Sequence, residues 1–336
     1  MKIRLLATLA LGILSACGEK KPANEPAVEK IHESRPLMGT LFQITCYSAE
    51  PDQARRALHA AFALAAGIEE VASDYQADSE LNRLCRAPHG QAHPLSPTLY
   101  QLLDHALQTA RLTQGAYDPT LGPLTRLWRE SRKNRALPEP PVLAQAQARC
   151  GFRHLQLDPE TRSATLALPG MQLDLGGIAK GFAADAMLAS LQKAGFPQSM
   201  IAAGGDLRLG DPPPGRPGWN VGLRTTRLEL DEVITLSNCA ISTSGDLHQS
   251  VTIDGTRYAH LIDPATGLGL TTQRAASVIA PSATLTDPLA TAACLLPDAP
   301  AFFEAREELS LRLLIPDAPP RLTGLFRENV ARTTRP

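Results

Sequence analysis

The chain has 336 residues, a length that allows one large domain or two of average size. Its composition, with 43% hydrophobic and 20% charged residues, excludes a disordered, collagen-like or coiled-coil protein. The formal charge of −1 provides no overall field for nucleic acid or an anionic membrane, and aromatic residues make up only 4%. Nucleic acid is therefore not an expected partner, and function has to come from local motifs.

The N-terminus has the layout of a secretory signal. Lys2 and Arg4 precede the apolar run Leu5 to Leu14, which is too short to cross the roughly 30 Å of a bilayer core. The following Ser15-Ala16-Cys17 resembles the lipobox of bacterial lipoproteins. That resemblance implies lipidation at Cys17 and a place on the periplasmic side of a bacterial membrane. A plain signal peptide with a chance cysteine is the alternative.

The segment after the signal predicts the domain organisation. Residues 1–16 are expected to be a lipoprotein signal peptide, and residues 17–36 a lipidated cysteine with a flexible tether. The tether is polar, bears prolines and has few large apolar residues, as a flexible linker does. Residues 37–336 are expected to form the folded domain.

The remaining cysteines do not form a recognisable pattern. They are odd in number, widely spaced and lack C-x-x-C, which argues against a disulfide framework and a zinc site. We expect free thiols, with one disulfide as the alternative. The five residues are Cys46, Cys85, Cys150, Cys239 and Cys294.

Hydrophobic periodicity predicts a mixture of helices and short strands along the chain. Helices are expected at 52–71, 79–84, 96–112, 142–150, 178–194 and 286–296. Strands are expected at 38–47, 152–157, 164–168, 172–175, 200–203, 206–209, 221–223, 228–236, 240–243, 251–253 and 277–280. The Pro-rich run 137–141 is expected to be a loop, and no motif is recognised after Leu296. The pattern favours one α+β domain, with helices packed on a largely antiparallel sheet.

A first motif joins a strand to a helix through Gly176-Gly177. Glycines let backbone amides approach an anion closely, and a helix N-terminus favours a phosphate. Lys180 adds a positive charge in the expected first turn. The alternative is a tight connection without a ligand, and the motif is neither a Walker loop nor G-x-G-x-x-G.

Three further motifs are, when each is taken alone, more often ordinary turns than sites. Ala203-Gly204-Gly205-Asp206 and Ser242-Thr243-Ser244-Gly245-Asp246 each bring a carboxylate to a glycine turn. The run from His260 to Gly267 places an imidazole and the Asp263 carboxylate at the end of a strand. There the alternative is an Asx turn capped by Asp263, with a structural histidine.

A fifth motif contains Asp287 and Thr291. In a helix, residues four apart lie on the same face, so the carboxylate and the hydroxyl offer hard oxygen ligands suited to Mg²⁺. The alternative is that Asp287 caps the helix and Thr291 faces solvent.

Taken together and in this order, these five motifs resemble the ApbE family of flavin transferases. The resemblance spans roughly residues 36–296 and includes three further short motifs. These are Met38-Gly39-Thr40, Ser79-Glu80-Leu81 and the stretch from Ala116 to Leu124.

The resemblance implies a single ApbE-like domain and a specific reaction. FAD and a Thr or Ser hydroxyl of a target protein would give a phosphoester-linked FMN and AMP, with Mg²⁺ as the required metal. The implied partners are FAD, membrane-bound redox subunits that carry the target Thr or Ser, and a membrane reached through the lipid anchor.

The resemblance also assigns roles to individual residues. Asp287, Thr291 and the Gly177 carbonyl would ligate Mg²⁺, and His260 would be the general base for the incoming hydroxyl. Asp206 and Asp246 are second-line candidates for polar contacts or metal support. The expected FAD contacts are Met38, Tyr75, Ala116, Tyr117, Asp118, Asp174, Lys180 and Ile262.

Three other functions remain as alternatives. An FAD pyrophosphatase would use water in place of the protein hydroxyl and release FMN and AMP. A non-catalytic FAD-binding lipoprotein would not need the oxygen ligands of Asp287 and Thr291. A lipoprotein without any ligand would leave the glycine and Asp/Thr motifs unexplained.

Overall fold

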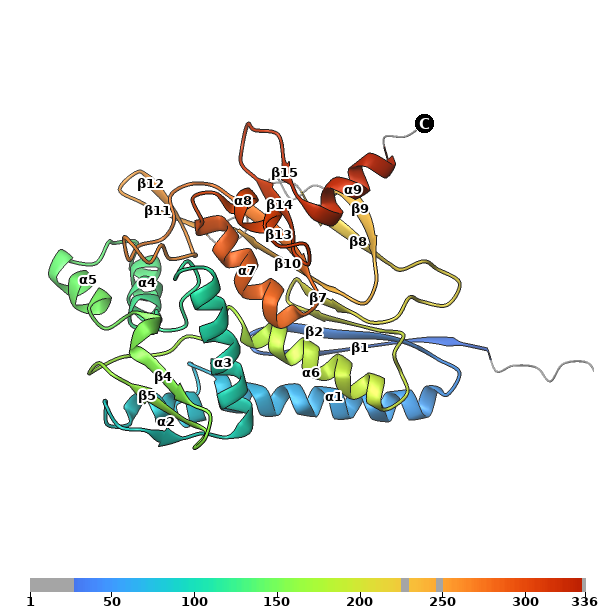
Figure 1. Ribbon diagram of the computed structural model, residues 1–336, viewed down its shortest axis with the longest axis horizontal. Helices are drawn as coiled ribbons and strands as arrows, with labels where there is room; N and C mark the ends of the chain where they lie inside the picture. The colour runs from blue at the N-terminus through green and yellow to red at the C-terminus, as the bar shows by residue number, and fades with distance from the viewer. Residues whose placement is uncertain (1–26, 225–229, 246–249, 334–336) are drawn as a thin grey trace, which may run out of the picture.

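An eight-stranded sheet forms the centre of the molecule (Figure 1). This computed structural model describes residues 27–224, 230–245 and 250–333. The strand order is β1-β2-β6-β7-β10-β13-β14-β15, and every neighbouring pair is antiparallel. The strands are β1 (Glu29–Leu37), β2 (Thr40–Ser48), β6 (Ser199–Ala203), β7 (Asp206–Leu209), β10 (Ala240–Gly245), β13 (Ala275–Ala280), β14 (Ser310–Leu314) and β15 (Arg321–Leu322).

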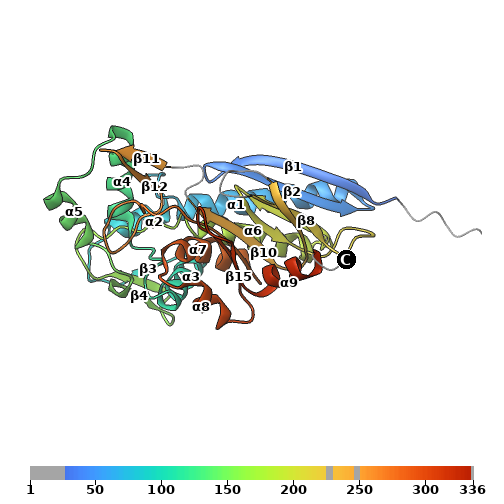
Figure 2. The same cartoon turned by 90° about the horizontal axis from the view of Figure 1, so that it is seen from above.

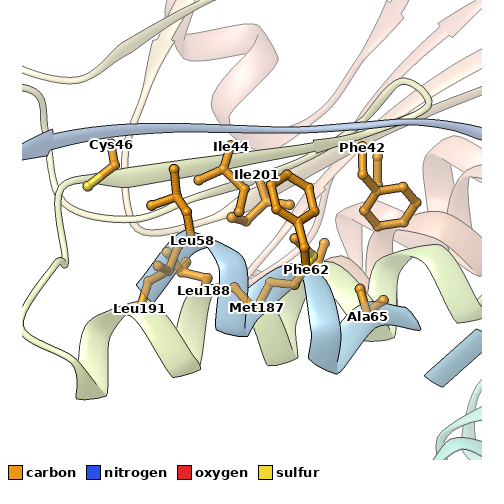
Figure 3. Close-up of a cluster of buried hydrophobic side chains, with 14 of the residues drawn as sticks. Phe42, Ile44, Cys46, Leu58, Phe62, Ala65, Met187, Leu188, Leu191 and Ile201 are labelled. Carbon is orange, nitrogen blue, oxygen red and sulfur yellow. The ribbon is translucent and has the colours of Figure 1, made fainter. Parts of the chain in front are cut away.

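Three helices cover one face of this sheet: α1 (Pro51–Ala72), α6 (Ala179–Lys193) and α7 (Ala283–Leu295). In α1 the buried residues recur every three or four positions, which is the period that places them on one helical face. Figure 3 shows Leu58 and Phe62 of α1 packed with Met187 of α6 beneath the strands. This core holds α1 and α6 side by side, and α7 continues the layer next to α6.

The opposite face of the sheet is covered by a hairpin and the last helix. Strands β8 (Trp219–Arg224) and β9 (Leu230–Leu236) form the hairpin, and α9 (Gly324–Thr333) lies beside it. Trp219 and Phe326 pack there against apolar residues of β10 and β13. The molecule therefore has three layers, with helices on one side and a hairpin on the other.

A second group of elements lies at one end of the sheet (Figures 1 and 2). It consists of α2 (Glu80–Arg86), α3 (Pro97–Leu112), α4 (Gly122–Asn134), α5 (Pro140–Gln147), η1 (Phe152–His154) and a small sheet of β3 (His93–Pro94), β5 (Ser163–Leu166) and β4 (Leu155–Asp158). Helix α3 contacts both α1 and α7. The hairpin of β11 (Ser250–Ile253) and β12 (Thr256–Ala259) packs on α4, and α8 (Ala299–Glu304) follows α7.

The α+β class with a largely antiparallel sheet is confirmed, and most expected elements form. Several details were wrong. Residues 29–36, expected in the tether, pair with β2 as the edge strand β1. The strand expected at 172–175 is only a single bridge between Leu121 and Gln172. Helix α4 was not expected at all, and neither were β3, β12, α8, β14, β15 and α9.

The described part of the chain contains no helix long and apolar enough to cross a membrane. No disulfide joins the five cysteines in the described part of the chain, and Cys46 and Cys294 are buried. The signal peptide and Cys17 lie outside the described residues.

Candidate active site

A cavity of about 490 Å³ lies where the second group of elements meets α6, α7 and the sheet. Among the residues that the structure describes, every one expected at the site lines it except Met38. The expected residues that it collects are Tyr75, Ala116, Tyr117, Asp118, Asp174, Gly177, Lys180, Asp206, His260, Ile262, Asp287 and Thr291. Motifs spread over more than two hundred residues therefore converge on one place.

Met38 does not line this cavity. It lies with Gly39 in the turn between β1 and β2, where its φ of 50° is left-handed, and it borders a separate hollow with Leu41 and Glu69. Its side chain packs against the apolar cores beneath. In this structure Met38 is a packing residue outside the cavity lining. Asp246, the other second-line candidate, lies outside the described residues.

The Lys180 ammonium group lies among three oxygen atoms. Its Nζ is 2.8 Å from Asp287 Oδ2, 3.1 Å from Asp206 Oδ2 and 3.3 Å from the Gly176 carbonyl oxygen. The three charged residues come from α6, α7 and β7. Asp206 follows the two-residue turn Gly204-Gly205, in which both glycines have positive φ, as a type I′ hairpin turn requires.

Burial and neighbouring charges shift the pKa values of this cluster. Burial, followed by repulsion from Asp206, raises the pKa of Asp287 to about 6, although Lys180 opposes the rise. Burial alone would lower the pKa of Lys180, but the charges of Asp287 and Asp206 outweigh it and raise the pKa above its usual value. Lys180 therefore stays charged at neutral pH, whereas Asp287 gains a proton under mildly acidic conditions.

Asp287 is not a helix cap. Helix α7 begins at Ala283, so Asp287 lies in its second turn, buried and facing the cavity. The alternative of a capping role is therefore wrong. Pro288 lies inside the helix, where it has no backbone N–H to donate to the Thr284 carbonyl.

The residues present fit a hard divalent cation. The Asp287 carboxylate and the Thr291 hydroxyl, which is 3.3 Å from Ser244 Oγ, both face the cavity from α7. Gly177 has no side chain, so a ligand role there would belong to its backbone carbonyl. A Cβ added at this position would lie 3.5 Å from Tyr117, which is an ordinary contact distance. The described residues contain no cluster of three His, Cys, Asp or Glu side chains arranged for a metal. A site here would therefore rely on oxygen donors of mixed kinds, as Mg²⁺ allows.

Asp118 shapes the wall of the cavity. One carboxylate oxygen accepts hydrogen bonds from the backbone N–H and hydroxyl of Thr120, at 2.8 and 2.6 Å. The other oxygen accepts from the Phe152 N–H at 2.9 Å. These bonds hold the loop before α4 against η1.

Tyr75 forms an exposed aromatic platform at the cavity. Its side chain is 77% exposed, and the Arg129 guanidinium lies 4.3 Å from its ring centroid. Arg129 also pairs with Asp74 at 2.5 Å. The buried Asn82 donates hydrogen bonds to three carbonyls of the Tyr75 loop, which fixes the loop. An aromatic ring that is held exposed in this way can stack on a flat ligand ring.

His260 is placed by a well-bonded stretch of backbone. The Ala259 carbonyl accepts from Trp128 Nε1 at 3.1 Å, and the backbone of Leu270 bonds to both neighbours of His260. The Asx turn that was the alternative at Asp263 does form, because its Oδ1 accepts from the Ala265 N–H at 2.9 Å. His260 itself lines the cavity, two residues before Ile262, which also lines it.

Sequence reasoning missed one wall of the site. Helix α4 contributes Trp128, Arg129 and Arg132 to the cavity. The available signal was weak: Pro123 at the helix start, and Leu124 and Trp128 spaced four residues apart on the buried face.

Replacing Tyr117 by phenylalanine is expected to stabilise the protein. The Tyr117 hydroxyl is buried without a hydrogen-bond partner among the described residues, and burial followed by nearby carboxylates raises its pKa well above normal. Removing an unsatisfied hydroxyl should raise the free energy of unfolding by about 1 kcal/mol, which thermal denaturation can measure. Thr120→Val is the control and should lower the free energy of unfolding, because it removes the hydrogen bonds of the Thr120 hydroxyl to Asp118 and the Gly151 N–H. A Tyr117→Phe protein less stable than the wild type would contradict this reading.

Comparisons with known proteins agree with this fold. The ApbE family model matches residues 38–313. The FAD:protein FMN transferase of Treponema pallidum is 33% identical over 83% of this chain and 82% of its own length. That of Vibrio cholerae is 32% identical over 80% of this chain and 79% of its own. The solved flavin transferase ApbE from Vibrio cholerae has a TM-score of 0.80 and 26% identity, covering 90% of this chain and all of that structure.

The fold, the site and these relatives define an enzyme of the flavin transferase class. The chain belongs to the ApbE family.

Proposed function

We propose that this protein transfers FMN from FAD to a Thr or Ser hydroxyl of a target protein. The hydroxyl oxygen bonds to the phosphorus on the FMN side, the pyrophosphate P–O bond breaks, and AMP leaves. The convergence of Lys180, Asp287, Thr291 and His260 on one cavity carries this proposal, together with the names of the relatives.

The chain's own residues would bind and orient FAD. Tyr75 offers its exposed ring to a flat ring of FAD, and Lys180 supplies a positive charge for the pyrophosphate. Asp287, Thr291 and the Gly177 carbonyl would hold Mg²⁺. When bound, the ion neutralises charge on the phosphate oxygens.

His260 would take the proton from the incoming hydroxyl. An imidazole is suited to this near neutral pH, and His260 lines the same cavity as the Lys180 cluster. The proton would leave the hydroxyl as its oxygen bonds to phosphorus, so His260 would act on the acceptor and not on FAD.

We also propose that the enzyme is anchored through Cys17 on the periplasmic side of a bacterial membrane. The basic region, apolar run and lipobox-like Ser15-Ala16-Cys17 support this location. Membrane-bound redox subunits with an accessible Thr or Ser would then be acceptors within reach.

The purified protein, FAD, Mg²⁺ and a candidate acceptor provide the test. Mass spectrometry should find an FMN-sized addition on the acceptor, with AMP formed in equal amount, and EDTA should abolish both. AMP and free FMN without an adduct, for acceptors of several sequences, would instead indicate the pyrophosphatase. Bound FAD without AMP would contradict the proposed chemistry.

The Mg²⁺ requirement is expected to rise in acid. Protons compete with a cation for Asp287, whose pKa is raised to about 6 first by burial and then by Asp206. Below that pH the Mg²⁺ concentration for half-maximal activity should increase about tenfold per pH unit, as titrations from pH 5 to pH 8 can show. Asp206→Asn removes the charge that repels the Asp287 carboxylate. The Mg²⁺ concentration for half-maximal activity should then begin to increase only at a lower pH. A half-maximal concentration that is the same at pH 5 and pH 8 would contradict the assignment.

A further inference from the structure

We propose that Asp185 is a positioning residue for the cation site, because it caps α7 from the neighbouring helix α6 and so fixes where Asp287 lies relative to Lys180. The inference rests on the proposed function, since it concerns the residues expected to hold the cation. It assigns no chemical step to Asp185.

Helix α7 receives its cap from another helix. Ser282, at the position before the helix, makes no side-chain cap bond. Asp185 accepts hydrogen bonds from the N–H groups of Ala283 and Thr284, at 3.0 and 2.8 Å, and from the Thr284 hydroxyl at 2.6 Å. These are the first-turn donors that a cap normally satisfies from within its own segment.

The capping residue Asp185 is also hydrogen-bonded to β7, the strand that carries Asp206. Arg208 of β7 donates from Nε to Asp185 Oδ1 at 2.7 Å, and its Nη1 donates to the carbonyls of Leu209 and Cys239. Arg208 lies two residues after Asp206, so both side chains lie on the same face of the strand.

The hydrogen-bonded group of Asp185, Thr284 and Arg208 therefore comes from the same three elements as the charged cluster at the cavity. Asp185 follows Lys180 on α6, Thr284 precedes Asp287 on α7, and Arg208 follows Asp206 on β7. The same three elements meet twice, once at the cavity and once just behind it.

The backbones of the two helices touch at the same level. A Cβ on Gly181 would lie 2.1 Å from the Ala283 carbonyl oxygen, so only glycine permits this approach. The cap and this contact both act on the first turn of α7, directly before the turn that carries Asp287. Loss of the cap should make that turn more mobile, and Asp287 should then no longer be held in one position relative to Lys180.

Asp185→Ala tests the proposal through cation binding without turnover. Mn²⁺ serves as the probe, and the EPR signal of free Mn²⁺ measures its binding to the protein without FAD. Removing a residue that orients a ligand typically lowers metal affinity about 10- to 100-fold, which is the expected result. Hydrogen exchange of the amides of residues 283–287 should become faster in the same variant. Asp185→Asn and Thr284→Val are milder changes that keep the test open if the alanine variant does not fold.

Asp298→Ala is the matched control. Asp298 caps α8 in the ordinary way, accepting from the Ala301 N–H at 3.2 Å, and it lies outside the cavity. This variant should lose stability but bind Mn²⁺ like the wild type. If the Asp185 variants also bind Mn²⁺ like the wild type, Asp185 is only structural and the proposal is overturned. A wild-type protein that binds no Mn²⁺ would contradict the proposed function, and unchanged exchange in α7 would separately overturn the role of Asp185.

Discussion

Replacing Asp287 by asparagine is expected to abolish flavin transfer while leaving the protein folded. The amide keeps the size of the side chain but removes the charge that would hold the cation. A bound metal stabilises the transition state by several kcal/mol, so the rate should fall about 1,000-fold or more. Acceptor flavinylation followed by mass spectrometry, together with thermal unfolding of the same sample, measures both quantities.

The expected retention of the fold follows from the charges around Asp287. Its carboxylate is buried and is repelled by Asp206, and Lys180 keeps its contacts with Asp206 and the Gly176 carbonyl when Asp287 is neutral. Asp263→Asn is the matched control, because Asp263 lies outside the cavity and the amide oxygen can still accept from Ala265. An Asp287→Asn protein with activity within tenfold of the wild type would exclude the metal assignment.

Replacing His260 by glutamine should slow transfer to the acceptor about 100- to 10,000-fold, the usual contribution of a general base. Glutamine can form hydrogen bonds but cannot take up the proton. The binding of FAD, followed by its fluorescence, should stay close to that of the wild type. Single-turnover rates at saturating FAD separate these two effects.

The pH dependence of this variant provides a second readout. Without an internal base, the rate should follow the ionised fraction of the acceptor hydroxyl and increase about tenfold per pH unit. The wild type should reach a plateau once the imidazole is neutral. His105→Gln is the control, since His105 packs near Phe182 away from the cavity lining. A rate for His260→Gln within threefold of the wild type would show that another group takes the proton.

Local sequence was enough to predict the motifs that meet in the cavity, because each depends on neighbours in the chain. Gly176-Gly177 marks the start of α6, and the four-residue spacing of Asp287 and Thr291 places both on one face of α7. The helix periodicity at 52–71 was equally clear, since α1 buries one continuous apolar stripe. These features need no knowledge of the tertiary fold.

Contacts between distant segments could not be predicted in this way. Asp185 and Thr284 are 99 positions apart, so no local capping rule connects them. The ion pair of Lys180 with Asp206 likewise depends on the order of strands in the sheet. Helix α4 was missed because it buries only a few large apolar side chains, with Leu124 and Trp128 as its main anchors. The bond that Asp118 accepts from Phe152 in η1 is likewise made between distant segments, so no local pattern predicts it.

Strand β1 has a consequence for how the enzyme would reach its acceptor. It spans Glu29–Leu37, and it ends at the turn whose Thr40 packs against Gly204 on the cavity wall. Nine residues of extended strand cover about 30 Å, so an anchor placed before β1 would be separated from the cavity by a rigid strut of that length. If the strand stood upright on the lipid surface, the cavity would lie about 30 Å above the anchor, within reach of acceptor hydroxyls presented above the headgroups.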